Sequence, residues 1–167
     1  LTVTVDRSGL PAGPYTGQVK TVLARQAPGV PVIDLFTDAP AFDPQSSAYL
    51  LEPYTRDLPA GTVVLAVVDP GVGTARRPLI VDADGRVFIG PDNGLFEMLR
   101  RRTRSFEASV IDWRPAKELS ATFHGRDILA PVAARLSQGL DPEWLGVPQD
   151  RLVPFDWPQV RVLPDRI

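Results

Sequence analysis

Residues 67–77 read Val-Val-Asp-Pro-Gly-Val-Gly-Thr-Ala-Arg-Arg, and this stretch decides how the rest of the chain is interpreted. The apolar run from Val63 to Val68 leads into it and predicts a buried strand. The Pro-Gly turn and the second glycine allow the backbone to approach a ligand closely. The strand thus delivers a carboxylate, Asp69, to a tight bend, and Arg76 follows where it can fold back towards that carboxylate. Loops at strand ends are where open α/β folds keep functional residues.

Strand and helix patterns alternate through the first half of the chain. Strands are expected at 1–5, 30–36 and 62–68, and helices at 15–26 and 43–52, the second with Asp43 as N-cap before Pro44. This alternation predicts an α/β fold, a three-layer sandwich with a largely parallel central sheet and helices on both faces. Three polar residues follow the strands and should share one edge of that sheet: Asp6, Thr37 and Asp69.

The second half changes character. Two apolar runs, 78–82 and 86–89, flank Asp-Ala-Asp-Gly at 82–85 and predict a hairpin. A helix is expected at 95–102, a short strand at 109–112, and a long helix at 122–138 that ends at Gly139. Pro131 should either bend that helix or mark its first turn. No periodicity is visible from residue 141 onward.

Composition narrows the classes of function. The 167 residues are 44% hydrophobic with a net charge of −2, which fits one domain with a real core and no nucleic-acid partner. The basic run Arg100–Arg102 with Arg104 is interpreted as a solvated helix end. The absence of cysteine and the single histidine exclude disulfides and thiolate or multi-histidine metal sites. No apolar run approaches the ~20 residues of a membrane span, and the first residues lack a signal-peptide pattern. We therefore expect no membrane partner and a cytoplasmic location.

Asp69, Arg76 and His124 are the strongest candidates for chemistry. A carboxylate, a guanidinium and an imidazole at one cleft can hold and polarise a water molecule, and imidazole accepts protons near neutral pH. Plainer interpretations stay open on the residues alone. Asp69 can cap the turn, Arg76 can lie on the surface, His124 can be structural, and Asn93 can belong to an ordinary turn.

Three segments taken together resemble one family. They are 67–77, the Gly-Pro-Asp-Asn-Gly of 90–94, and the Phe-His-Gly-Arg-Asp of 123–127 with Pro-Val-Ala-Ala at 131–134. In this order they resemble the S-adenosyl-L-methionine (SAM) hydroxide adenosyltransferases, the SAM hydrolases related to fluorinase and chlorinase. The resemblance covers most of residues 1–146, an N-terminal domain. It leaves 147–167 as a tail rich in Pro and Trp, and we expect the family's β-rich C-terminal domain to be absent from this chain.

The resemblance implies a reaction and a set of site residues. Water or hydroxide would attack the ribose 5′ carbon of SAM and release adenosine and L-methionine, with no metal and no cofactor. Asp69, Arg76 and His124 match the family's water-activating triad, which the halogenating relatives lack. The resemblance also implies that the chain forms a homotrimer and acts on a nucleoside substrate. The positions implied to contact that substrate are Asp6, Tyr15, Gly73, Thr74, Asn93, Phe123 and Gly125.

Departures from the family pattern, above all Gly13 and the expected absence of the C-terminal domain, favour an alternative. Gly13 stands where a ribose-binding Asp is expected, and Thr37-Asp38 replaces Thr-His. A carboxylate accepting from two ribose hydroxyls is a strong contact, so its loss should weaken SAM binding. The alternative is a non-catalytic module that binds SAM or adenosine, or a trimerising domain without a ligand.

Overall fold

The computed structural model describes residues 2–6, 12–116, 120 and 122–155, with side chains from Tyr15 onward. The elements follow in chain order: β1 (Thr2–Asp6), α1 (Ala12–Gln26), β2 (Val32–Phe36), α2 (Pro44–Thr55), β3 (Val63–Val67), β4 (Pro78–Ala83), β5 (Arg86–Pro91), α3 (Glu97–Arg102), β6 (Phe106–Ile111), η1 (Gly125–Leu129), α4 (Ala130–Ser137), η2 (Pro142–Trp144) and β7 (Gly146–Pro148).

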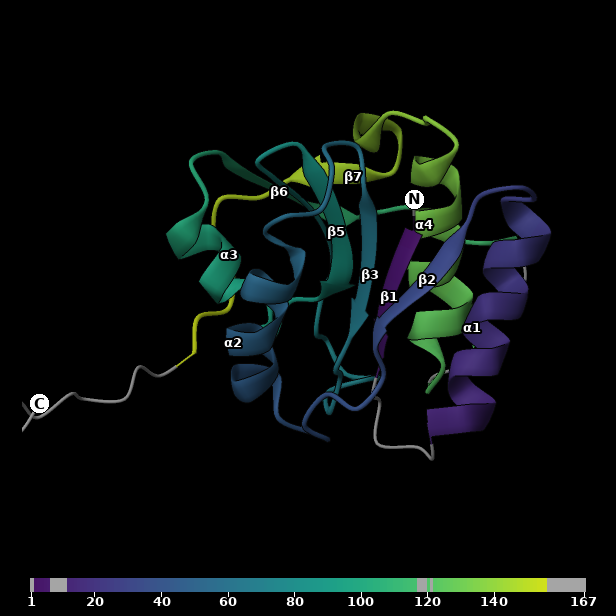
Figure 1. The fold of residues 1–167 in the computed structure, drawn as a ribbon, viewed down its shortest axis with the longest axis horizontal. Helices are drawn as coiled ribbons and strands as arrows, with labels where there is room; N and C mark the ends of the chain where they lie inside the picture. Colours follow the sequence, from purple (N-terminus) through teal and green to yellow (C-terminus); the bar gives the residue numbers. More distant parts are fainter. Residues whose placement is uncertain (1, 7–11, 117–119, 121, 156–167) are drawn as a thin grey trace, which may run out of the picture.

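The strands form one mixed sheet in the order β2-β1-β3-β5-β4-β6-β7. Pairing is parallel from β2 to β5, through β1 and β3. Pairing is antiparallel from β5 through β4 and β6 to β7. The carboxyl ends of β1, β2, β3 and β5 therefore lie along one edge of the sheet, the lower edge in Figure 1.

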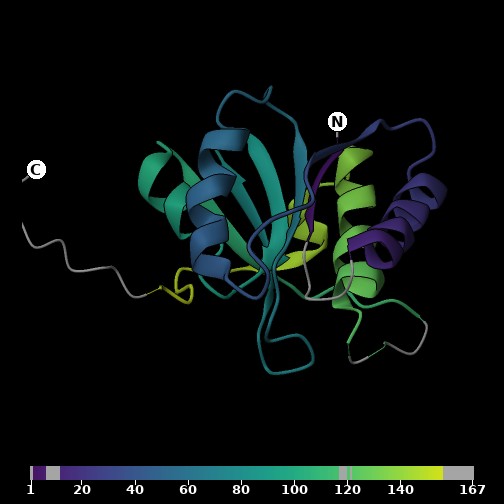
Figure 2. The same ribbon diagram turned by 60° about the horizontal axis from the view of Figure 1, so that its bottom comes forward.

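Helices cover both faces of the sheet (Figures 1 and 2). Alternate residues of β3 show this directly. Val63, Leu65 and Val67 belong to the core beneath α1 and α4, whereas Val64 and Ala66 belong to the core with α2 and α3. Every residue of β3 is buried, as expected for a central strand covered on both sides.

The mixed α/β class is confirmed, but the expectation of a largely parallel sheet is wrong. Asp84 and Gly85 both have positive φ, at 51° and 74°, which is the conformation of a two-residue type I′ hairpin turn. A two-residue turn can join only antiparallel strands, because a parallel pair needs a crossover of a dozen residues or more. β6 and β7 then add antiparallel to the hairpin, and β7 carries the sheet past residue 146 into the expected tail.

Local signals placed several element ends correctly. The Asp43 side chain accepts a hydrogen bond from the Ser46 backbone N–H at 2.9 Å and caps α2, with Pro44 in the first turn. Gly139 follows α4 with φ of 88°, as expected for a helix C-terminus. The expected bounds were least accurate for the short strands: β6 spans Phe106–Ile111, whereas a strand was expected at 109–112.

The expected helix at 122–138 is split. The segment η1 is a π-helix, in which the Ala130 N–H donates to the carbonyl of Gly125, five residues back. Pro131 lies in the first turn of α4 and has no N–H to continue an α-helical ladder backwards. The wider turn accommodates that missing donor, and such π segments recur at functional sites. His124 immediately precedes it.

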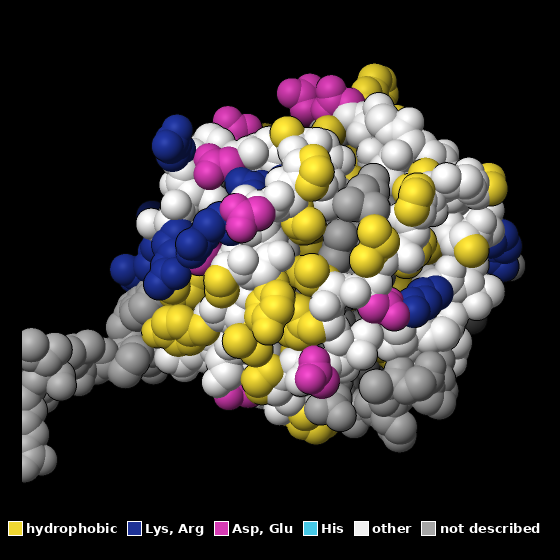
Figure 3. Space-filling view, in the orientation of Figure 1, with side chains coloured by type: hydrophobic (Ala, Val, Ile, Leu, Met, Phe, Trp, Pro, Cys, Tyr) yellow, Lys and Arg dark blue, Asp and Glu magenta, His cyan; other side chains and the backbone are white. Residues whose placement is uncertain are grey.

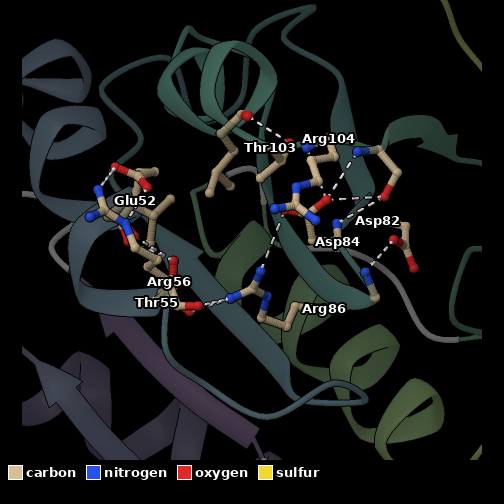
Figure 4. Close-up of polar contacts among 12 residues, drawn as sticks. Glu52, Thr55, Arg56, Asp82, Asp84, Arg86, Thr103 and Arg104 are labelled. Carbon is tan, nitrogen blue, oxygen red and sulfur yellow. Dashed lines mark hydrogen bonds and ion pairs between the residues drawn. The ribbon is translucent and has the colours of Figure 1, made fainter.

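The basic run at the end of α3 is not simply a solvated helix end. Arg100 and Arg101 bind Glu97, and Arg102 reaches Glu52 on α2, where Arg56 also binds. Both glutamate side chains are at most 7% exposed. Arg86 of β5 donates to the carbonyl of Thr55 at 3.0 Å, and Figure 4 shows this contact beside Glu52 and Arg56. These contacts fasten α2, α3 and the hairpin together.

No helix among the described residues combines the length and the apolar character needed to cross a membrane.

Two glycine substitutions should have opposite effects on stability. At Gly90 a Cβ would stand 2.3 Å from the Ala66 carbonyl oxygen and 2.8 Å from the Phe96 ring, whereas at Gly17 of α1 nothing lies within 4 Å. Gly90→Ala should lower the free energy of unfolding by about 1–3 kcal/mol through overpacking. Gly17→Ala should raise it by roughly 0.5–1 kcal/mol. Urea denaturation measures both, and a neutral Gly90→Ala would contradict the packing of β3 against β5.

Candidate functional site

The loop after β3 is folded tightly on itself. The Thr74 hydroxyl donates to the Gly71 carbonyl at 2.7 Å and accepts from the Arg76 N–H at 3.3 Å. Gly73 has φ of 83°, a conformation that glycine adopts without strain. The loop is therefore shaped by Thr74 and Gly73, and it returns Arg76 to the end of β3.

Asp69 and Arg76 form a buried ion pair at this edge. Arg76 Nε donates to Asp69 Oδ1 at 3.1 Å, and Nη2 donates to Oδ2. The side chains are only 2% and 6% exposed. The interpretation of Arg76 as a surface residue is therefore wrong, and the Asp69 carboxylate faces the guanidinium fork with both oxygens.

His124 joins this pair through Arg76. Its Nδ1 lies 3.3 Å from Arg76 Nη2, although the two residues are 48 positions apart in sequence. A guanidinium only donates hydrogen bonds, so Nδ1 must be the acceptor, and the neutral ring carries its hydrogen on Nε2. The order of contact is thus Asp69, Arg76, His124, with the arginine in the middle.

The surroundings of His124 keep its ring neutral. Burial lowers the pKa of the imidazole below its ordinary value of 6.5, and the positive charge of Arg76 lowers it further. The negative charge of Asp69 acts in the opposite direction without reversing the shift. Near neutral pH the ring is consequently an uncharged donor through Nε2.

Three of the expected substrate contacts touch one another. The rings of Tyr15 and Phe123 stack at 5.9 Å, and the Arg126 guanidinium lies 4.7 Å from the Phe123 ring centroid. A Cβ on Gly125 would stand 1.8 Å from the Tyr15 hydroxyl oxygen. Only glycine lets η1 approach α1 this closely, so this contact fixes the turn that carries His124.

Asn93 and Asp6 also lie at the same edge. The Asn93 side-chain amide donates to the carbonyl of Val68 at 2.8 Å, and its oxygen accepts from the Leu95 N–H at 3.3 Å. Asn93 therefore ties the end of β3 to the turn before α3. Asp6 ends β1 and pairs in register with Val67, two residues before Asp69, while its side chain lies outside the described part.

Sequence analysis missed a second arginine–aspartate pair beside the first. Arg77 Nε donates to Asp92 Oδ2 at 2.9 Å, and the Asp92 side chain is 2% exposed. The Arg-Arg doublet and the Pro-Asp-Asn turn were the only signals for it, and neither shows the register that brings the two together. Two sizeable cavities lined by described residues, of about 570 and 710 Å³, do not include any of the three triad residues in their lining.

Comparisons with known proteins find relatives over most of the chain. The sequence profile described as "SAM hydroxide adenosyltransferase N-terminal domain" matches residues 10–146. A protein of Thermus thermophilus named (R)-S-adenosyl-L-methionine hydrolase is 49% identical in an alignment 146 residues long that covers 80% of this chain and 55% of that protein. A fluorinase of Actinopolyspora mzabensis is 25% identical over 89% of this chain and 58% of its own length.

A solved structure shares the fold. The crystal structure of an uncharacterized conserved protein from Thermotoga maritima superposes with a TM-score of 0.89 at 32% identity, covering 95% of this chain and 62% of that one. The chain thus spans about half the length of the curated relatives it matches.

The imidazole of His124 should titrate below pH 6.5. Because the unfolded ring takes up a proton before the folded one, the free energy of unfolding should fall as the pH drops from 6.5 to the folded pKa, and should be unaffected by this group above 6.5. Arg76→Met removes the nearby positive charge and leaves Asp69 unpaired, so the pKa of His124 should rise. Proton NMR resolves this easily because the 167 residues hold one histidine. Arg100→Met, with the same change of net charge, is the control, and an unchanged pKa in Arg76→Met would contradict the contact.

Proposed function

The chain belongs to the SAM hydroxide adenosyltransferase family, and on that premise we propose that it hydrolyses SAM to adenosine and L-methionine. The observation that supports this most directly is the Asp69–Arg76–His124 contact at the carboxyl edge of the sheet. These are the residues that match the family's triad. Three relatives are named (R)-S-adenosyl-L-methionine hydrolase, after the same reaction.

The reaction is a displacement at the ribose 5′ carbon. The oxygen of water or hydroxide forms a bond to that carbon while the carbon–sulfur bond breaks, and its electron pair stays on the sulfur of methionine. A sulfonium is a good leaving group and needs no protonation by an acid. The protein's task is to hold a poorly solvated oxygen nucleophile in line with the breaking bond, and no metal or cofactor enters this scheme.

The hydrogen bonds favour a particular division of labour. Both oxygens of Asp69 accept from Arg76, and His124 Nδ1, the proton-accepting atom of the neutral ring, faces the same guanidinium, so both groups are engaged by Arg76. We therefore assign Arg76 and the Nε2–H of His124 to stabilising hydroxide character on the nucleophile. In this assignment the water loses its proton to solvent before attack, and Asp69 holds Arg76 in place. This revises the sequence-based expectation that the imidazole of His124 accepts the proton of the bound water.

A second candidate is a module that binds SAM or adenosine without turnover. Gly13, at a position where the family is expected to place a ribose-binding Asp, is the observation that favours it.

Incubation with SAM should yield adenosine, and in ¹⁸O-labelled water the label should appear in the 5′ hydroxyl. Asp69→Asn, Arg76→Lys and His124→Ala should each lower kcat by about 10²- to 10⁴-fold, the range for positioned polar groups. Chromatography measures the product, and Arg101→Gln, which removes a cation from α3, is the control. If the wild-type chain forms no adenosine but SAM raises its Tm, the binding module is the correct function. If turnover is unchanged in His124→Ala, that residue has no part in the mechanism.

We also propose a homotrimer and a cytoplasmic location, both following from the family resemblance. An exposed apolar surface supports association, since Phe42, Tyr49 and Tyr54 are 59%, 37% and 54% exposed. Apolar side chains gather over α2 in Figure 3. Light scattering after gel filtration should give three times the 18.2 kDa of one chain. Tyr54→Lys, placed on this surface, should lower that mass, and a monomeric wild type would reject the trimer for this chain.

A further inference from the structure

The Arg77–Asp92 pair has no part in the mechanism proposed above. It lies one position beyond the last rung of the β4–β5 ladder, which joins Pro78 to Pro91. The Asp92 N–H donates to the Arg77 carbonyl at 2.9 Å, so backbone and side chains of the two residues are both joined. The Asp92 side chain is only 2% exposed, so Asp92 is a buried carboxylate that forms an ion pair with this arginine.

The pair touches the triad through one backbone atom. Arg76 Nη1 donates to the Arg77 carbonyl at 3.1 Å, and this is the same oxygen that accepts the Asp92 N–H. The Arg76 guanidinium is thus held by Asp69 on one side and by the Arg77 carbonyl on another, and it presents Nη2 to His124. A displacement of Arg77 would therefore turn Arg76 relative to His124.

The segment 151–155 closes the other side of the pair. Arg77 Nη2 donates to the carbonyl of Arg151 at 2.7 Å, and the Val153 N–H donates to Asp92 Oδ1 at 2.8 Å. Phe155 packs over the turn that follows Asp92, where a Cβ on Gly94 would stand 3.2 Å from the Phe155 Cβ. Both oxygens of the buried Asp92 carboxylate therefore have donors, and one of those donors comes from this late segment.

We propose that Arg77 and Asp92 are positioning residues that set the orientation of Arg76, and that segment 151–155 completes them through the Val153 N–H. The consequence for turnover rests on the proposed function, whereas the effect on His124 does not. Because 1 Å of misplacement can cost about 100-fold in rate, a pair that never touches substrate can still control the reaction. The chain after β7 is thereby coupled to the triad.

Arg77→Gln and Asp92→Asn should each raise the pKa of His124 and change its ¹⁵N chemical shifts, because Arg76 Nη2 no longer faces Nδ1. The charged groups that act on this ring are Arg76, Asp69, Arg114 and Asp127, and none of them is altered in these variants. We expect kcat for adenosine formation to fall about 10- to 100-fold, with KM changing less. Arg77→Lys keeps the charge without the planar fork and should recover only part of the loss.

Two further variants separate positioning from general destabilisation. Arg100→Gln removes one arginine from Glu97, a carboxylate buried to the same 2% exposure, and should lower Tm while leaving the His124 spectrum unchanged. Val153→Pro deletes the N–H that binds Asp92 Oδ1 and leaves both members of the pair in place, so it should move the pKa of His124 upward by a smaller amount.

The NMR result decides the proposal independently of activity. If Arg77→Gln and Asp92→Asn fold, as judged by circular dichroism, and keep the wild-type pKa and ¹⁵N shifts of His124, the positioning role is rejected. If those variants do not fold, Val153→Pro decides, and a wild-type His124 spectrum in that variant rejects the proposal. If the wild-type chain forms no adenosine, the proposed function fails while the spectra still support or reject the positioning role.

Discussion

The buried contact between Asp69 and Arg76 is the interaction on which the edge of this sheet depends. A carboxylate and a guanidinium that are 2% and 6% exposed are stable together, because each supplies the charge and hydrogen bonds that the other lost on burial. Removal of one partner from such a pair typically costs about 3–5 kcal/mol, since the remaining charge is left unpaired. The glycine-rich loop between them exists to bring Arg76 back to the strand end. His124 then takes its orientation from the same guanidinium, so one ion pair organises a strand, a loop and a distant helix.

The sheet has two parts with different roles. The parallel strands β2, β1, β3 and β5 align their carboxyl ends and so gather Asp6, Asp69 and Asn93 at one edge. Among the antiparallel strands, β4 starts at that edge immediately after Arg77 and pairs with the end of β5, and β6 runs back towards the edge. The cross-strand register places Arg77 opposite Asp92. Segment 151–155, which follows β7, forms hydrogen bonds with both residues. The antiparallel half thus braces the edge that the parallel half creates.

Features that depend on neighbouring residues could be predicted from the sequence, whereas features that depend on contacts between distant segments could be predicted only in part. Asp43, Gly139 and the Asp84-Gly85 turn were predictable because caps and turns depend on a few neighbouring residues. The sheet was wrongly expected to be largely parallel, because the order and direction of its strands depend on pairing between segments that are far apart in the chain. Arg100 and its neighbours were read as solvated because nothing local shows that Glu97 and Glu52 are buried beneath them. The substrate contacts expected of Tyr15, Gly125 and Asn93 remain predictions. In the structure these residues contact other parts of the protein, and no motif reveals those contacts.

In the proposed reaction, an arginine paired with an aspartate has a physical advantage over an unpaired arginine. SAM brings a positively charged sulfonium, and an unpaired arginine at the site would repel it. Asp69 cancels the charge of Arg76, and a neutral His124 adds a donor through Nε2 without adding charge. Attack of hydroxide on a sulfonium brings opposite charges together and cancels them, so the reaction is favoured where water is excluded and their attraction is less screened. A buried aspartate–arginine pair beside an uncharged imidazole therefore offers hydrogen-bond donors to an anionic nucleophile without an excess of positive charge against the substrate.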